Sequence, residues 1–158
     1  MTAHTTTAND RLAMLNIYLP EAPTPFGAYV PAVQTGNLLF LSGMLATSGH
    51  EAKMTGLVGK SLDVDEGRDA AYIAALNLLA LTQKILGSLN QVSRVVRLGV
   101  YVASTPEFTE HAKVADAASE LLRDIFGDEA VSSRLVFGVA SLPLGSPVEL
   151  EAILEVSR

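Results

Sequence analysis

The stretch from residue 132 to residue 154 constrains the fold more than any other part of the chain. It reads SSRLVFGVASLPLGSPVELEAIL, two apolar runs separated by a segment with two prolines and a glycine. Proline fixes φ and glycine permits conformations closed to other residues, so the middle segment favours a tight turn. We therefore expect a β-hairpin with strands over about residues 134–140 and 147–154.

Two stretches have the spacing of amphipathic helices. The first begins after Asp63 or Asp65 and ends near Gly87, where a left-handed cap is expected. Its apolar stripe comprises Ala70, Ala71, Ala74, Leu78, Leu81 and Ile85. The second is expected to begin at Thr105-Pro106-Glu107, with threonine as N-cap and proline in the first turn, and to end at Gly127.

The other segments predict strands and connectors. Residues 27–33 and 38–42 read as two strands joined at Gly36-Asn37, and residues 92–103 read as a long strand. A short strand is expected near residues 54–58. At the N-terminus we expect a mobile tail over residues 1–10, then a short helix or turn over residues 11–19 and a proline-rich connector.

This order predicts one α+β domain over residues 1–158, with a mixed sheet and both helices on one face. In a sheet with one face in water, apolar and polar residues should alternate along each strand. Three stretches instead have apolar residues at successive positions: Val95-Val96, Val100-Tyr101-Val102 and Leu135-Val136-Phe137. Two helices cover only one face. We therefore expect the chain to self-associate through the other face; the alternative is that the extra apolar residues pack only at the sheet edge.

Composition excludes several classes of function. The net charge is −6 and the 11 basic residues are scattered, which argues against a nucleic-acid partner. There is no cysteine, and the three histidines lack ligand spacing, so we expect no metal site. No apolar run reaches about 18 residues and no secretory signal is evident, so we expect no membrane partner and a cytoplasmic location.

Arg134 and Glu149 are the charges most suited to chemistry. Arginine offers a planar fork of donors for a carboxylate. In the predicted hairpin Glu149 pairs near Gly138, and Arg134 shares its face about 13 Å away. That separation is too long for a salt bridge, so either a ligand fills it or Arg134 meets a partner across a subunit interface. The alternative is that both are ordinary solvated charges.

The chain resembles the Rid (YjgF/YER057c/UK114) family of reactive-intermediate enamine/imine deaminases over about residues 26–156. The motifs that carry the resemblance are Phe26-Gly27-Ala28-Tyr29, residues 36–43 (GNLLFLSG), residues 95–102 (VVRLGVYV), and the C-terminal R-x-x-x-x-V-A-x-L-P-x-x-x-x-V-E-x-E pattern from Arg134 to Glu151. The last of these is long and specific. The region before Arg134 is longer than usual, similar to a subgroup with a V-A-[ND]-x-A-S-x-L-[LF] helix followed by F-G.

The resemblance implies a chorismate-mutase-like α+β fold and a homotrimer, in which the sheets form a central barrel with clefts between subunits. By position, it implies that Arg134 binds a substrate carboxylate, that Glu149 positions or activates water, and that Tyr29, Ser42 and Gly43 line the cleft. Two further positions differ from active members. Val136 stands where many have cysteine, and Asp116 is the nearest counterpart of an asparagine on the second helix.

Two functions follow as hypotheses. The first is hydrolysis of reactive 2-enamino or 2-imino acids to 2-keto acids and ammonia, which needs a bound carboxylate and one oriented water but no cofactor. The second is a non-catalytic trimer that binds a small carboxylate-bearing metabolite as a sensor or scaffold. A ribonuclease activity, also attached to this family, fits the acidic charge least well.

Overall fold

The structure, a computed structural model, describes residues 5–157. Its helices are α1 (Ala8–Met14), α2 (Val64–Leu86) and α3 (His111–Phe126), with short 3₁₀ turns η1 (Leu89–Gln91), η2 (Asp128–Ala130) and η3 (Pro143–Gly145). Its strands are β1 (Ala32–Thr35), β2 (Leu38–Leu45), β3 (Thr47–Ser48), β4 (Glu51–Ala52), β5 (Val92–Ala103), β6 (Ser133–Val139) and β7 (Val148–Val156). The predicted α+β class is confirmed.

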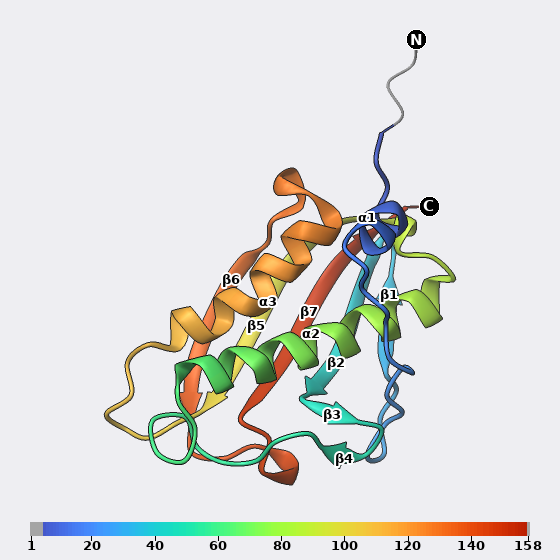
Figure 1. Cartoon of the computed structure of the whole chain (residues 1–158). Helices are drawn as coiled ribbons and strands as arrows, with labels where there is room; N and C mark the ends of the chain where they lie inside the picture. The colour runs from blue at the N-terminus through green and yellow to red at the C-terminus, as the bar shows by residue number, and fades with distance from the viewer. Residues whose placement is uncertain (1–4, 158) are drawn as a thin grey trace.

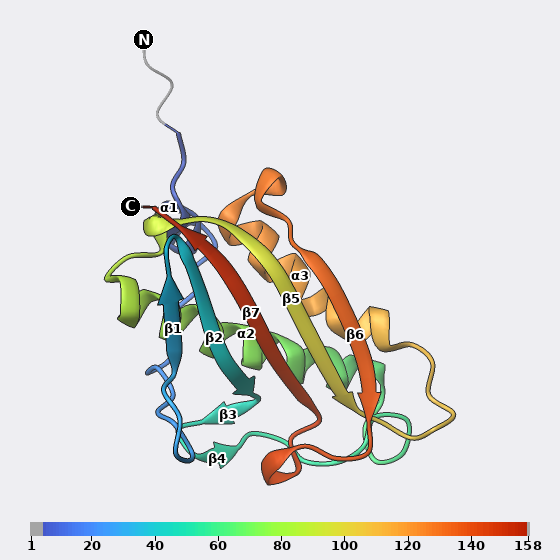
Figure 2. The ribbon, with the colours of Figure 1, turned by 180° about the vertical axis from the view of Figure 1, so that it is seen from behind.

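A five-stranded mixed sheet has the order β1-β2-β7-β5-β6 (Figures 1 and 2). All neighbours are antiparallel except β5 and β6, which run parallel. The predicted hairpin at Gly36-Asn37 is confirmed, because Thr35 pairs with Leu38. Strand β1 is shorter than expected, since residues 27–31 form bends and coil, and of the strand predicted near residues 54–58 only isolated bridges at Val58 form.

The predicted C-terminal hairpin is wrong. Both of its strands form, but β5 lies between them and pairs with each, as Figure 2 shows. Val100 of β5, for example, pairs with Val136 on one side and Leu150 on the other. A proline–glycine segment bends the chain equally well for a hairpin or for a connection that crosses a third strand, so the turn residues alone do not fix which strands pair.

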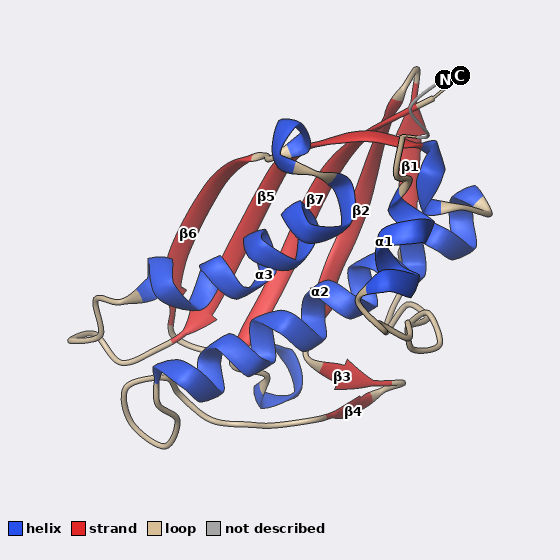
Figure 3. Cartoon of the chain, turned by 45° about the horizontal axis from the view of Figure 1, so that its top comes forward, coloured by secondary structure: helices blue, strands red, loops and turns tan. Residues whose placement is uncertain are grey.

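Helices α2 and α3 pack side by side on one face of the sheet, as predicted (Figure 3). Four alanines of α2 belong to the hydrophobic core and let the helix approach the sheet closely: Ala70, Ala71, Ala74 and Ala75. Buried leucines and valines of β2, β5 and β7 complete the core beneath them. No helix among residues 5–157 is long and apolar enough to cross a membrane.

The ends of the helices test the predicted caps. Asp63 and Glu66 form a capping box at the start of α2, and Gly87 ends it with φ 79°. Gly127 ends α3 as expected, but α3 begins at His111 rather than beside Pro106. Residues 104–108 instead bond to the segment at Val58 and turn back on themselves, which uses the backbone groups of the predicted first turn.

The N-terminal segment is more ordered than predicted. Residues 1–4 of the expected mobile tail lie outside the described residues, but Thr7 and Asp10 form a capping box that starts α1 at Ala8. Helix α1 packs against α3 and η1. Beyond it, an extended connector runs alongside α2 and β3 towards residue 26 (Figure 1).

The second face of the five-stranded sheet carries no helix (Figure 2). Large apolar side chains are exposed on it: Val33, Phe40, Val96, Leu135 and Phe137. Phe137 is 49% exposed and lies 6.3 Å, centroid to centroid, from the ring of Tyr101. The apolar residues that point away from the helices therefore form an uncovered hydrophobic face in the single chain rather than a second core.

Candidate active site

A cavity of about 580 Å³ opens at the end of the sheet where β2 ends and β7 begins. Its lining residues come from four separate segments: Phe26, Tyr29, Ser42, Gly43, Leu45, Pro143, Leu144 and Glu149. Four of them, Tyr29, Ser42, Gly43 and Glu149, are candidates from the sequence. The fold therefore brings together the N-terminal and C-terminal parts of the family resemblance in one cleft.

A β-bulge places Ser42 and Gly43 in this cleft. Leu41 pairs with Ala152 and Met44 with Leu150, so β2 has one more residue than β7 over this interval. The extra residue bends the strand and turns its backbone out of the regular ladder. The Ser42 hydroxyl donates to the carbonyl oxygen of Val30 at 2.6 Å, which fixes the neighbouring segment against the bulge.

The carboxylate of Glu149 lies directly over Gly43. A Cβ on residue 43 would stand 3.0 Å from Cδ of Glu149 and closer still to Oε1, so only glycine leaves room for this carboxylate. No described residue donates a hydrogen bond to the carboxylate of Glu149. Burial, and secondly the nearby charge of Glu151, raise the pKa of Glu149 above its ordinary value. An unpaired, half-buried carboxylate with a raised pKa is suited to proton transfer.

Aromatic and apolar side chains form the opposite wall. The hydroxyl of Tyr29 accepts a hydrogen bond from the backbone N–H of Phe26 at 3.0 Å. Phe26 stacks on His50 at a centroid distance of 4.3 Å, and the imidazole of His50 hydrogen-bonds to Thr24. Leu144, at φ 59°, projects at the rim and is 47% exposed.

The cleft also contains three residues that the sequence did not indicate as site candidates: Phe26, Pro143 and Leu144. Phe26 and Pro143 lie within the family motifs, but an apolar residue in such a motif is expected to pack in the core rather than to line a site. Leu144 carries a signal only in the backbone: a non-glycine residue with positive φ is uncommon and often marks a functional segment.

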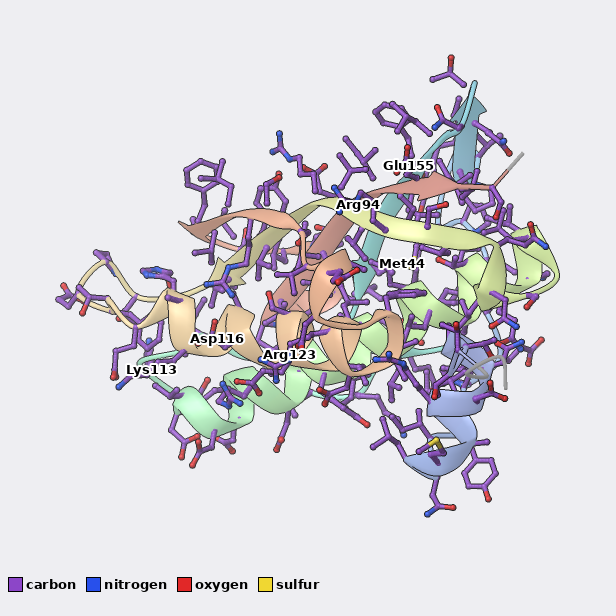
Figure 4. The ribbon with its side chains drawn as sticks, turned by 90° about the horizontal axis from the view of Figure 1, so that it is seen from above. Met44, Arg94, Lys113, Asp116, Arg123 and Glu155 are labelled. Carbon is purple, nitrogen blue, oxygen red and sulfur yellow. The ribbon has the colours of Figure 1, made fainter. Side chains whose placement is uncertain are left out.

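Arg134 lies elsewhere, on the face of β6 that the helices cover. Its Nη1 donates to Oδ1 of Asp116 at 2.7 Å and to Oγ of Ser119 at 3.1 Å, both on α3. Figure 4 labels Asp116 on this helix. No described residue accepts from Nε or Nη2 of Arg134, so one edge of the guanidinium is free for a carboxylate. Asp116, proposed from sequence as a cleft residue, is therefore the direct partner of Arg134.

The prediction that Arg134 and Glu149 share a face is wrong. Arg134 of β6 pairs with Leu98 of β5, which in turn pairs with Ala152 of β7, and these three side chains lie on the helix face. Glu149 pairs with Tyr101, and both of these side chains lie on the open face. Their Cα atoms are about 14 Å apart, two strands across and three residues along. The two side chains would share a face only if β6 paired directly with β7, but β5 lies between these strands. Val136 shares the helix face with Arg134 and packs against the core, outside the Glu149 cleft.

A second polar group lies on the open face beside Glu149. Tyr101 donates to Glu151 at 3.0 Å, and Nη2 of Arg97 lies 3.5 Å from the same carboxylate oxygen. Partial burial, followed by the hydrogen bond to Glu151, raises the pKa of Tyr101. Arg97 and Tyr101 thus hold Glu151 in place, whereas the carboxylate of Glu149 has no such partner. Among residues 5–157 no three acidic or histidine side chains cluster as metal ligands would.

Comparisons with known proteins agree with this architecture. A family model described as "YjgF/chorismate_mutase-like, putative endoribonuclease" matches residues 9–154. The chain is 43% identical over 148 residues to "Protein TCP17" of Trypanosoma cruzi, covering 93% of this chain and 92% of that protein. It is 30% identical over 141 residues to a "2-iminobutanoate/2-iminopropanoate deaminase" of Dermatophagoides farinae, covering 89% and 94%.

A solved structure has the same fold. Protein Atu1372 from Agrobacterium tumefaciens, described as of unknown function, superposes with a TM-score of 0.87 and 38% sequence identity, over 95% of this chain and 92% of that one. The match extends over almost the whole chain, so it includes both the Glu149 cleft and the segment that carries Arg134.

Proposed function

Because this chain belongs to the YjgF/chorismate mutase-like family, we propose that it hydrolyses reactive 2-imino or 2-enamino acids to 2-keto acids and ammonia. The observation that carries the proposal is the free, half-buried carboxylate of Glu149 over Gly43 in an open cavity. A relative that is 30% identical bears the name of such a deaminase.

The chemistry requires few groups. Water adds to the electrophilic carbon of the protonated imine while Glu149 accepts a proton from that water, which gives a neutral carbinolamine. Glu149 then returns this proton to the nitrogen. The C–N bond breaks as the carbinolamine hydroxyl gives its proton to Glu149, which leaves the 2-keto acid and releases ammonia; the ammonia then takes up that proton. The substrate carboxylate binds the free edge of an Arg134 guanidinium. The apolar wall of Phe26 and Leu144 limits access of bulk water.

We further propose that the active species is a cytoplasmic homotrimer in which Arg134 of one subunit approaches the Glu149 cleft of the next. A single chain holds these residues on opposite faces of its sheet, so one chain cannot form the complete site. The exposed apolar residues of the open face support the assembly, because a face of this kind is stable in water only when it is covered. The proposed trimer covers it with the sheets of its neighbours.

The test is an ammonia-release assay on 2-imino acids generated in situ from several amino acids. Arg134→Ala removes the carboxylate anchor, so kcat/KM should fall by about 100-fold or more, the value of a buried charge-assisted pair. Arg123→Ala, an exposed arginine of α3, is the matched control. Unchanged activity in Arg134→Ala, with the wild type active, would refute the mechanism.

A non-catalytic carboxylate-binding trimer is the second candidate, and the ion pair between Asp116 and Arg134 favours it. A guanidinium that the protein holds in place can bind a ligand carboxylate whether or not the ligand then reacts. Glu149→Gln separates the two functions. A catalyst loses turnover and keeps affinity for a 2-keto acid, whereas a binding protein shows no turnover in either form.

A further inference from the structure

A second cavity, of about 390 Å³, lies between the N-terminal connector, α2 and the β3–β4 turn. The connector that forms its outer wall is seen beside α2 and β3 in Figure 1. None of its lining residues lines the Glu149 cleft. Its volume falls within the range of roughly 300–1,000 Å³ typical of small-molecule sites. The proposed reaction makes no use of it.

The floor of this cavity contains a buried polar side chain with a free acceptor. Asn77 of α2 is 2% exposed, and its Nδ2 donates to the carbonyl oxygens of Leu45 and Thr47 at 3.0 and 2.9 Å. Its Oδ1 accepts from no described residue. Every fully buried side-chain oxygen in the described part of the chain has a hydrogen-bond partner. Because Oδ1 of Asn77 has none, this atom is not fully buried, and we take it to face the cavity that Asn77 lines.

Two opposite charges stand on the walls. Lys53, just after β4, and Glu21, on the connector, both line the cavity and form no ion pair or hydrogen bond with a described residue through their side chains. Ile73 and Leu76 of α2 and Ala22 of the connector add apolar surface to the same lining. The arrangement offers a cation, an anion, a buried acceptor and a hydrophobic floor within one small volume.

We propose that this cavity binds a free α-amino acid with an apolar side chain. The ligand carboxylate pairs with the Lys53 ammonium. The ligand ammonium, which has three donors, bonds to Glu21 and to Oδ1 of Asn77. The side chain packs on Ile73 and Leu76. A ligand with only one of the two charges leaves a wall charge unmatched, so zwitterions are preferred over the corresponding amines and acids.

The experiment titrates L-leucine into the protein and follows methyl NMR signals, with isovalerate and isoamylamine as single-charge probes. We expect saturable shifts at Ile73, Leu76 and Ala22, and weaker binding of both probes. Lys53→Gln should weaken leucine binding about 5–10-fold, as expected for loss of one charge-assisted contact. Lys84→Gln, an exposed lysine at the end of α2, should bind as the wild type.

Two further variants decide the location. Ile73→Trp fills the cavity and should abolish binding, whereas Arg134→Ala should leave it unchanged, since that arginine serves the other site. The proposal is overturned if leucine shifts only Leu45 and Leu144 of the Glu149 cleft, if Lys53→Gln binds like the wild type, or if no binding occurs at millimolar leucine. None of these outcomes depends on the chain being a deaminase.

Discussion

Arg134 and Glu149 lie on opposite faces of one sheet, with β5 between their strands. Leu98 of β5 is the neighbour of Arg134 on the helix face, and Tyr101 is the neighbour of Glu149 on the open face. Two groups separated by a sheet cannot hold one small substrate from the same chain. If both act on one substrate, they come from different chains.

Mixed oligomers test this directly. Arg134→Ala and Glu149→Gln should each be inactive alone, but mixing the two after denaturation and co-refolding should restore activity. In a closed ring that contains both variants, one interface joins an intact Arg134 to an intact Glu149. Ammonia release by the co-refolded mixture is the measurement. A mixture as inactive as its components would show that both residues act within one chain.

Asp116 holds Arg134, and its negative charge should repel any carboxylate that binds the same guanidinium. Asp116→Asn keeps a hydrogen-bond acceptor for the guanidinium and removes the negative charge. We expect KM for a 2-imino acid to fall by about 3–10-fold with kcat little changed, because a like charge near the ligand is lost. Asp124→Asn, on the exposed side of the same helix, is the control. A rise in KM would mean that the carboxylate of Asp116 is needed to orient Arg134.

Gly43 is the position where one added carbon should be most damaging. Its Cβ would collide with the Glu149 carboxylate, so Gly43→Ala should displace that group and lower kcat about 100-fold, a typical cost for a misplaced catalytic group. Gly27→Ala, whose Cβ has ordinary contacts with Tyr29, should keep activity. Circular dichroism checks that both variants fold; a fully active Gly43→Ala would remove Glu149 from the mechanism.

The raised pKa of Glu149 also predicts how stability depends on pH. Between the ordinary value of 4.5 and the higher value in the folded protein, the folded chain keeps a proton that the unfolded chain has lost. Stability from this group is therefore complete below about pH 4.5 and is lost as pH rises through the folded pKa. Glu149→Gln should then be more stable than the wild type at neutral pH and equal to it in acid.

Thermal unfolding of the two proteins across this pH range measures the difference. The exposed Glu107 provides the control, because Glu107→Gln also removes one carboxyl group but lies outside the cleft. A wild-type protein that is more stable than Glu149→Gln at neutral pH would indicate that the charged carboxylate has a favourable partner in the assembled protein.

The sequence predicts the elements of this fold better than their arrangement. Residues 92–103 form a strand over their full predicted length, and Asp63, Gly87 and Gly127 bound the helices, because periodicity and capping act over a few residues. Strand order depends on contacts between distant segments, and nothing in the Pro143–Pro147 turn reveals that β5 separates β6 from β7.

The candidate site follows the same division. The local motifs identify Tyr29, Ser42, Gly43 and Glu149, which the fold brings together. They do not place Arg134, because its position relative to Glu149 depends on strand order. The error in the predicted hairpin thus became an error in the geometry of the site.

Both ends of the described chain are tied to the same short turn. Asn9 bonds to Ser88 and Asn90, and Ser157 bonds to Gln91, so the first helix and the last strand meet around η1. Figure 1 shows this meeting point at the end of the molecule opposite β4. A circular permutant with these ends joined and new ends cut in the 105–110 turn would keep every strand pairing. This meeting point lies beside the last residues of β7, whereas the Glu149 cleft lies at its first residues.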